Sequence, residues 1–251
     1  MNFCGCQITE DLKTLGLENG DSVVVHSSYK SVGLVDGGPH AVIESLMETV
    51  LPDGALLFPN LNIPHEFTKG APPLFDLKKD SVKNKTGIIP EVFKFEYAEH
   101  FSMHPTHSMM GIGEKASDIL KDHDKAGVPC GKGTPWEKNA FCGGKILLIG
   151  VGQNSNTTCH STEEQIENPY KLSADIIDGI VAVDGKEIVV PSRLHLWKYN
   201  ADFNIINAEL EARDYMKTGR VGNADALLID AAAFIELCLD KMRHDKEYFL
   251  L

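Results

Sequence analysis

Residues 22–58 read SVVVHSSYKSVGLVDGGPHAVIESLMETVLPDGALLF, and this segment sets the architecture of the chain. The β-branched run Ser22–Val25 predicts a strand. A loop over 26–38 follows, and Pro39 suits the first turn of a helix. The turn Pro52-Asp53-Gly54 then leads into a second apolar run, Ala55–Phe58. This order predicts a βαβ unit, in which two parallel strands are joined by a right-handed crossover helix.

The predicted crossover helix has one apolar face, because its apolar residues recur at helical spacing. Those residues are Val42, Ile43, Leu46, Met47 and Val50.

The rest of the chain continues to alternate between strand-like and helix-like patterns. Residues 59–86 are rich in Pro, Lys, Asn and Asp and lack periodicity, which predicts a long loop suited to a substrate-facing lid. Asp184-Gly185 predicts a hairpin turn. The other expected elements are helices over 88–99, 114–123, 201–217 and 231–243, strands over 108–112, 145–151 and near 226–229, and hairpin strands over 176–183 and 187–190. We expect one α/β domain over residues 1–251.

Composition narrows the class of protein. The chain has 251 residues, of which 43% are hydrophobic and 24% charged, as in ordinary globular proteins. Its formal net charge of -12 argues against a general nucleic-acid surface, which is usually basic, and favours cationic small molecules. The N-terminus has no apolar signal segment, and the longest apolar run is far too short to span a membrane. The six scattered cysteines predict reduced thiols in a cytoplasmic protein rather than a disulfide framework.

The loop after the first strand carries hydroxyls and a cation ahead of a helix N-terminus. Ser27, Ser28, Lys30 and Ser31, with three glycines, make a plausible phosphate cradle. The loop has neither the Walker pattern nor the dinucleotide fingerprint. An ordinary βα loop is the alternative.

Two histidines occur in the segment His104-Pro105-Thr106-His107-Ser108. Histidines at this spacing can ligate a metal, but no third ligand is spaced convincingly nearby. A structural or substrate-contacting role is the alternative that the sequence favours.

A third polar group, His160 with Glu163, follows the apolar run 145–151 within the segment NTTCHSTEE (156–164). If a helix begins here, the two residues lie on one face, and the carboxylate can orient the imidazole and raise its basicity. Such a pair suits a general base. Alternatively, Ser161 and Glu164 have the spacing of a capping box, with Thr158 or Thr162 as other caps. A Cys159–His160 dyad has poor geometry, because adjacent residues point apart.

Taken together, these segments resemble the antibiotic N-acetyltransferase family, whose best-known members are the aminoglycoside N3-acetyltransferases. The resemblance covers about residues 10–245. The segments that carry it are HSSYKSVGLVDGG (26–38), HAVIESL (40–46), PDGALLFP (52–59), FD (75–76), TGIIPEVF (86–93), HPTHSMMGIG (104–113), His123 with GVPCGKGTPW (127–136), GGKILLIGVG (143–152), NTTCHSTEE (156–164) and VGNADALLID (221–230).

The resemblance implies a layered α/β/α domain with a mixed, partly parallel sheet, unlike the GNAT acetyltransferase fold. It implies transfer of an acetyl group from acetyl-coenzyme A to an amine of an aminoglycoside or related amino sugar. His160 would be the general base and Glu163 would orient it. Two further groups of residues are expected at the site: His26, Ser27, Ser28, Lys30 and Ser31 would hold the coenzyme, and His104, His107, Asp76 and Glu164 would contact the acceptor.

The chain departs from the family at one motif. Where the family often has Arg-Ser before x-His-Pro, this chain has Phe101-Ser102. The missing arginine and the somewhat shorter chain put the acceptor in question more than the reaction. A homodimer is compatible with the resemblance.

Three other functions stay open. The same acyl transfer could act on a non-antibiotic amine. A metal-dependent hydrolase could be built on His104, His107, His123 and His160, although we expect no metal. A non-catalytic protein could retain the fold and bind only coenzyme A.

Overall fold

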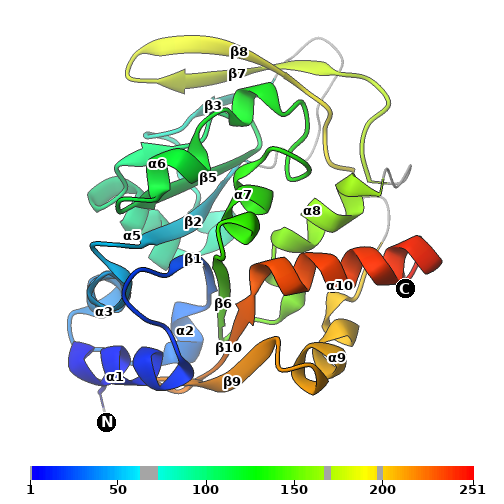
Figure 1. The fold of residues 1–251 in the computed structure, drawn as a ribbon. Coiled ribbons are helices and arrows are strands. Elements are labelled where there is room, and N and C mark those ends of the chain that lie inside the picture. The colour runs from blue at the N-terminus through cyan, green and yellow to red at the C-terminus, as the bar shows by residue number, and fades with distance from the viewer. Residues whose placement is uncertain (1, 63–72, 167–170, 197–199) are drawn as a thin grey trace.

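A computed structural model describes residues 2–62, 73–166, 171–196 and 200–251 of the chain. Its centre is a seven-stranded sheet with the strand order β4-β5-β2-β1-β6-β10-β9. Helices pack on both faces of this sheet, so the architecture is α/β and layered as expected (Figure 1).

The predicted βαβ unit lies at the centre of the sheet. Strand β1 (Ser22–Ser27) pairs in parallel with β2 (Ala55–Leu61), and helix α3 (Gly38–Val50) connects them. On its other side β1 pairs in parallel with β6 (Lys145–Ile149). The carboxyl ends of β1 and β6 therefore open at the same edge of the sheet.

Antiparallel strands complete the sheet and make it mixed. Strands β10 (Ala224–Asp230) and β9 (Met216–Val221) extend it beyond β6. Strands β5 (His107–Ile112) and β4 (His100–Phe101) extend it beyond β2.

A smaller sheet consists of β3 and a hairpin. Strand β3 (Leu74–Asp76) pairs with β7 (Ile177–Val183), which pairs with β8 (Lys186–Ser192). Asp184-Gly185 forms the turn of the β7–β8 hairpin, as the sequence predicts.

Alternation along β1 assigns its side chains to the two helical layers. Val23 and Val25 pack with α1 (Gly5–Leu15), α3 and α5 (Ile88–Glu96). Val24 faces the other layer. That layer contains α6 (Ala116–Leu120), α7 (Pro135–Phe141), α8 (Thr158–Gln165) and α10 (Ala231–His244). The shorter helical segments are α2 (Tyr29–Val32), α4 (Lys83–Thr86), α9 (Asn207–Ala212) and the 3-10 turns η1 (His123–Lys125), η2 (Gln153–Ser155) and η3 (Phe203–Ile206).

Several predicted elements are wrong. The single helix expected over 201–217 is instead η3, α9 and the start of β9, because Met216–Val221 pairs with β10. The loop expected over 59–86 contains β3 and α4, while residues 63–72 of this predicted lid lie outside the described residues. The helix expected over 114–123 is confined to α6. Helices α1 and α7 were not predicted.

The expectation of reduced thiols is wrong at the N-terminus. Cys4 and Cys6 form a disulfide, with a Cα–Cα distance of 5.3 Å. The number of cysteines indicates only whether a framework of several disulfides is expected. This single bridge depends instead on local geometry at the start of α1. There Cys4 Sγ also accepts a hydrogen bond from the Gln7 backbone N–H, which caps the helix.

None of the helices within the described residues has both the length and the apolar character needed to cross a membrane.

Candidate active site

A cavity of about 810 Å³ opens where the carboxyl ends of β1 and β6 meet. Its lining comes from four segments that are distant in sequence: the loop after β1, the end of β2, the segment around α4 and α5, and the segment that leads into α8. His160 is among the lining residues. The cavity therefore brings the predicted cradle and the predicted base to one site.

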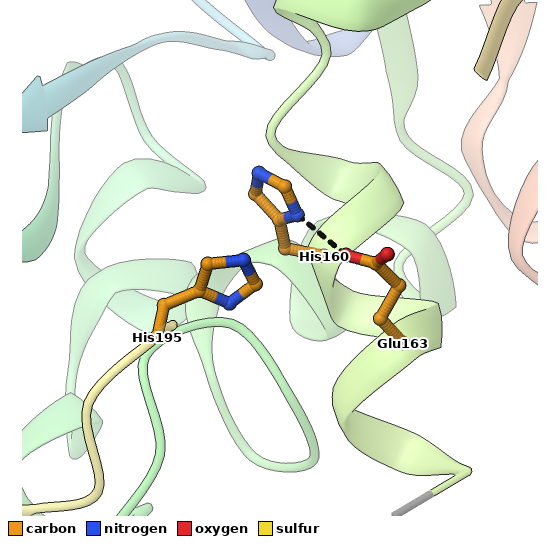
Figure 2. A group of neighbouring side chains, drawn as sticks. All are labelled: His160, Glu163 and His195. Carbon is orange, nitrogen blue, oxygen red and sulfur yellow. Dashed lines mark hydrogen bonds and ion pairs between the residues drawn. The ribbon is translucent and has the colours of Figure 1, made fainter. Parts of the chain in front are cut away.

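His160 and Glu163 lie on one face of α8, as their spacing predicts. His160 Nδ1 is 2.7 Å from Glu163 Oε2, and this hydrogen bond is drawn in Figure 2. Glu163 Oε1 is 2.9 Å from the Nζ atom of Lys171. Both carboxylate oxygens of this buried side chain are therefore paired.

The electrostatic surroundings keep Glu163 ionised. Burial by itself would raise the pKa of the Glu163 carboxyl group. The hydrogen bond and charge of His160, together with the charge of Lys171, outweigh burial and hold this pKa below its ordinary value. An ionised Glu163 accepts the Nδ1 proton of His160, so the neutral ring carries its lone pair on Nε2.

The capping-box alternative for this segment is wrong. Helix α8 begins at Thr158, whose backbone N–H donates to Asn156 Oδ1. Glu164 accepts hydrogen bonds from the backbone of Cys130 and Gly131 instead of from its own helix. Cys159 is buried, and burial raises its pKa well above the ordinary value, which makes it a poor nucleophile.

Four of the five residues predicted to hold the coenzyme line the cavity: His26, Ser27, Ser28 and Lys30. Ser31 lies behind them and donates a hydrogen bond from its hydroxyl to Ser28 Oγ at 2.9 Å. Among the described residues, the buried atoms Ser27 Oγ and His26 Nε2 have no hydrogen-bond partner. Unpaired buried polar atoms beside a cavity are suited to a polar ligand.

His26 is held neutral. Burial, and to a smaller extent the nearby His160, lower the pKa of His26 to about 3. Its ring stacks at a centroid distance of 6.3 Å on Trp136, which is fully buried. His26 is therefore a neutral wall of the cavity at physiological pH.

The predicted acceptor contacts His104 and His107 are buried outside the lining of the cavity. His104 Nδ1 accepts hydrogen bonds from the backbone N–H groups of Thr106 and His107, so its Nε2 carries the proton and donates to Ser192 Oγ at 3.0 Å. Burial lowers the pKa of both histidines, that of His107 to about 3. These bonds fix the backbone between β4 and β5.

The other two predicted acceptor contacts are also turned away from the lining. Asp76 accepts hydrogen bonds from the backbone N–H groups of Lys78 and Lys79, which close a turn after β3. The side chain of Glu164 is 0% exposed. Neither residue lines the cavity.

Two residues near His160 were not predicted, Lys171 and His195. Leu172 forms an isolated antiparallel bridge with His195, and both unpredicted residues contact α8, Lys171 at Glu163 and His195 at His160. The ring of His195 lies 4.2 Å from that of His160 between centroids, on the side away from Glu163 (Figure 2). Each is a single polar residue in an irregular segment, so no sequence pattern marks them.

The four histidines of the hydrolase alternative do not form one metal site within the described part of the chain. His123 instead accepts from Ser102 at Nδ1 and donates from Nε2 to the carbonyl of Pro129. The side chains whose ligand atoms lie within 4.8 Å of one another are His160, Glu163 and His195. Glu163 in that set is already paired with both His160 and Lys171.

The chain is similar to known proteins of one family. Residues 24–243 match the family described as aminoglycoside 3-N-acetyltransferase. The chain is 31% identical to the SPbeta prophage-derived aminoglycoside N(3')-acetyltransferase-like protein YokD of Bacillus subtilis, over 91% of this chain and 88% of that protein. It is 30% identical to aminoglycoside N(3)-acetyltransferase III of Salmonella sp, over 89% of this chain and 86% of that protein. The solved structure of AAC-IIIb in a binary complex with CoASH superposes with a TM-score of 0.81, at 25% identity, over 97% of each chain.

Proposed function

Because the chain belongs to the aminoglycoside 3-N-acetyltransferase family, we propose that it transfers an acetyl group from acetyl-coenzyme A to an amine, with His160 as the general base. The observation that carries this proposal is the pairing of His160 with an ionised, buried Glu163 at the wall of the cavity. Members of the family named as aminoglycoside acetyltransferases support the reaction class.

Proton removal is the task that His160 would perform. An aminoglycoside amine is mostly protonated near neutral pH, and an ammonium group has no lone pair with which to attack a thioester. The Nε2 atom of His160 would accept a proton, and the negative charge of Glu163 would stabilise the resulting imidazolium. Lys171 would hold Glu163 in place from its other oxygen.

The coenzyme would bind along the loop after β1. Ser27, Ser28 and Lys30 supply hydroxyls and an ammonium group to the cavity, and Ser27 Oγ is a buried atom with no partner among the described residues. Lys85 lines the cavity from the opposite segment and adds a second cation. These groups fit the phosphates of a nucleotide-derived acyl carrier. The complex of AAC-IIIb with CoASH supports coenzyme A as the ligand.

The reaction at the thioester carbonyl also depends on positioning and on donors for the oxyanion. Holding the thioester and the amine together removes much of the entropic barrier. The developing oxyanion needs donors, and the groups available at the cavity wall are at Ser27, Ser28 and Thr157.

For the acceptor we propose an amine of an aminoglycoside or a related amino sugar. The names of the relatives support this choice, and the net charge of -12 suits a cationic sugar. Release of free thiol from acetyl-coenzyme A, measured with a panel of aminoglycosides and simple amines, tests it. Turnover with simple amines alone would contradict the aminoglycoside assignment and leave the acyl transfer in place.

The role of His160 is tested by His160→Ala, with His244→Ala as the matched control on the exposed C-terminal turn of α10. Loss of a positioned general base lowers turnover by about 10²–10⁴-fold. We expect this loss for His160→Ala, with unchanged binding of coenzyme A by calorimetry. Full turnover by His160→Ala would refute the assignment.

A further inference from the structure

Glu164 is a buried carboxyl group that the proposed reaction does not use. Its Oε2 atom accepts hydrogen bonds from the backbone N–H groups of Cys130 and Gly131, at 2.8 and 2.7 Å. Its Oε1 atom has no hydrogen-bond partner among the described residues. His195 Nδ1 lies 3.5 Å from this oxygen. Both side chains are buried, with 1% of His195 and 0% of Glu164 exposed.

Charge at this place is disfavoured by what surrounds it. The ionised Glu163 is the preceding residue of the helix and disfavours a second negative charge, whereas the charge of Arg193 acts in the opposite direction. Burial raises the pKa of Glu164 to about 8, although the two backbone hydrogen bonds oppose the shift.

His195 is also held without charge. Burial lowers its pKa well below the ordinary value, and the charges of His160, His107 and Lys171 act in the same direction. A neutral imidazole has one nitrogen that accepts a hydrogen bond and one that donates.

We propose that Glu164 is a neutral carboxylic acid whose Oε1–H group donates a hydrogen bond to Nδ1 of His195. The donors and acceptors then match at every position: Oε2 accepts from two backbone N–H groups, Oε1 donates, and Nδ1 of His195 accepts. The tautomer of His195 is fixed with its proton on Nε2.

The consequence for catalysis rests on the proposed function. The ring of His195 packs against His160 at 4.2 Å between centroids and a tilt of 48°. Glu163 holds His160 by a hydrogen bond, and the ring of His195 lies on the other side of the same imidazole (Figure 2). Glu164 supports that ring through His195. Glu164 and His195 are therefore positioning residues. Because His195 is neutral, it adds no further positive charge beside the imidazolium that forms during proton transfer.

Infrared difference spectroscopy tests the protonation directly. The spectrum of wild type minus Glu164→Gln, at pH 7 in H₂O and in D₂O, should contain the carbonyl band of a neutral carboxylic acid, shifted in D₂O. The same comparison with Glu163→Gln should contain carboxylate bands. Carboxylate bands lost in Glu164→Gln would overturn the proposal. This experiment needs no turnover, so its result is separate from the fate of the proposed function.

The positioning role is tested by rescue with an isosteric side chain. Glutamine keeps an acceptor for Cys130 and Gly131 and a donor for His195, whereas alanine keeps neither. We expect kcat to fall by about 10²-fold in Glu164→Ala, since small misplacements of a base have costs of this size. Glu164→Gln should retain most of the wild-type kcat, and the KM for coenzyme A should be unchanged in both variants. ¹⁵N spectra of His195 should report an Nε2-protonated ring in wild type and in Glu164→Gln.

Two results would contradict this role. Equal loss of kcat in the glutamine and alanine variants would show that position 164 requires a negative charge. An Nδ1-protonated or doubly protonated His195 would remove the hydrogen bond on which the pair depends. If Glu164→Ala does not fold, the comparison of Glu164→Gln with wild type in the spectra still decides the protonation.

Discussion

A neutral Glu164 makes the stability of the fold depend on pH in a direction opposite to that of an ion-paired carboxylate with a lowered pKa. The pKa of this group is about 8 in the folded chain, against an ordinary value of 4.5 for the unfolded chain. Between these values the native state holds a proton that the unfolded state releases. The contribution of Glu164 to stability is thus complete below pH 4.5, declines as the pH rises, and is lost above about pH 8.

Glu164→Gln removes this dependence while it retains the shape of the side chain. A shift of one pKa unit corresponds to about 1.4 kcal/mol, so the full shift corresponds to about 5 kcal/mol. From pH 5 to pH 7 the free energy of unfolding of Glu164→Gln should rise by about 3 kcal/mol relative to that of wild type. The buried histidines also titrate below their ordinary pKa, but they are common to both proteins and cancel in this difference.

The assay is urea unfolding of both proteins at half-unit steps from pH 5 to pH 8. Glu209→Gln is the matched control, since ion pairs with Lys241 and Arg213 lower the pKa of Glu209. The pH-dependent contribution of Glu209 to stability therefore changes below pH 4.5. From pH 5 to pH 8 the free energy of unfolding of Glu209→Gln should differ from that of wild type by a constant amount. A constant difference for Glu164→Gln as well would refute the reasoning, because it would mean that the group loses its proton near the ordinary pKa.

Three other changes have outcomes that the structure predicts. Lys171→Met should lower the free energy of unfolding by about 3–5 kcal/mol in denaturant titrations, because it leaves the buried carboxylate of Glu163 without its cation. An unchanged free energy would mean that the ion pair between Lys171 and Glu163 is not formed. Lys30→Ala should lower the affinity for coenzyme A about tenfold in calorimetry, because one charge-assisted hydrogen bond is worth about 1.5 kcal/mol. An equal loss of affinity in Lys78→Ala, the control, would point to a general charge effect. Phe93→Ala should destabilise the fold by about 3–5 kcal/mol in thermal or urea unfolding, and the half-exposed Phe95→Ala, which is the control, should cost much less.

The parts of the fold that the sequence predicts are those whose signals are local. The run Ser22–Val25 is β-branched, its helix has a continuous apolar face, and turn residues mark the ends of both. The pairing of His160 with Glu163 is equally local, because residues three apart on a helix are neighbours whatever surrounds them. Such features need no knowledge of the tertiary structure.

The parts that the sequence does not predict depend on partners far along the chain. The predicted helix over 201–217 ran into residues 216–217, and no strand was predicted over 218–221, although Met216–Val221 forms an edge strand paired with β10. Lys171 and His195 lie beside Glu163 and His160, and the bridge between Leu172 and His195 joins their two segments, which are distant from each other in sequence. The role of Glu164 as an acceptor contact could not be judged without the loop of Cys130 and Gly131, which occupies its carboxyl group.

Glu163 and Glu164 are chemically identical neighbours, so their opposite protonation states must come from what each one faces. Successive residues on a helix point about 100° apart, and this rotation sends one side chain toward Lys171 and the other toward the backbone of Cys130 and Gly131. Around Glu163, the hydrogen bond and charge of His160 together with Lys171 outweigh burial, whereas two backbone N–H groups stabilise the Glu164 carboxylate too weakly to offset its full burial. Carboxyl groups whose surroundings separate their pKa values in this way are typical of sites that move protons. The ionised member can then stabilise the charge that His160 gains, and the neutral member can fix the position of that ring without competing for its proton.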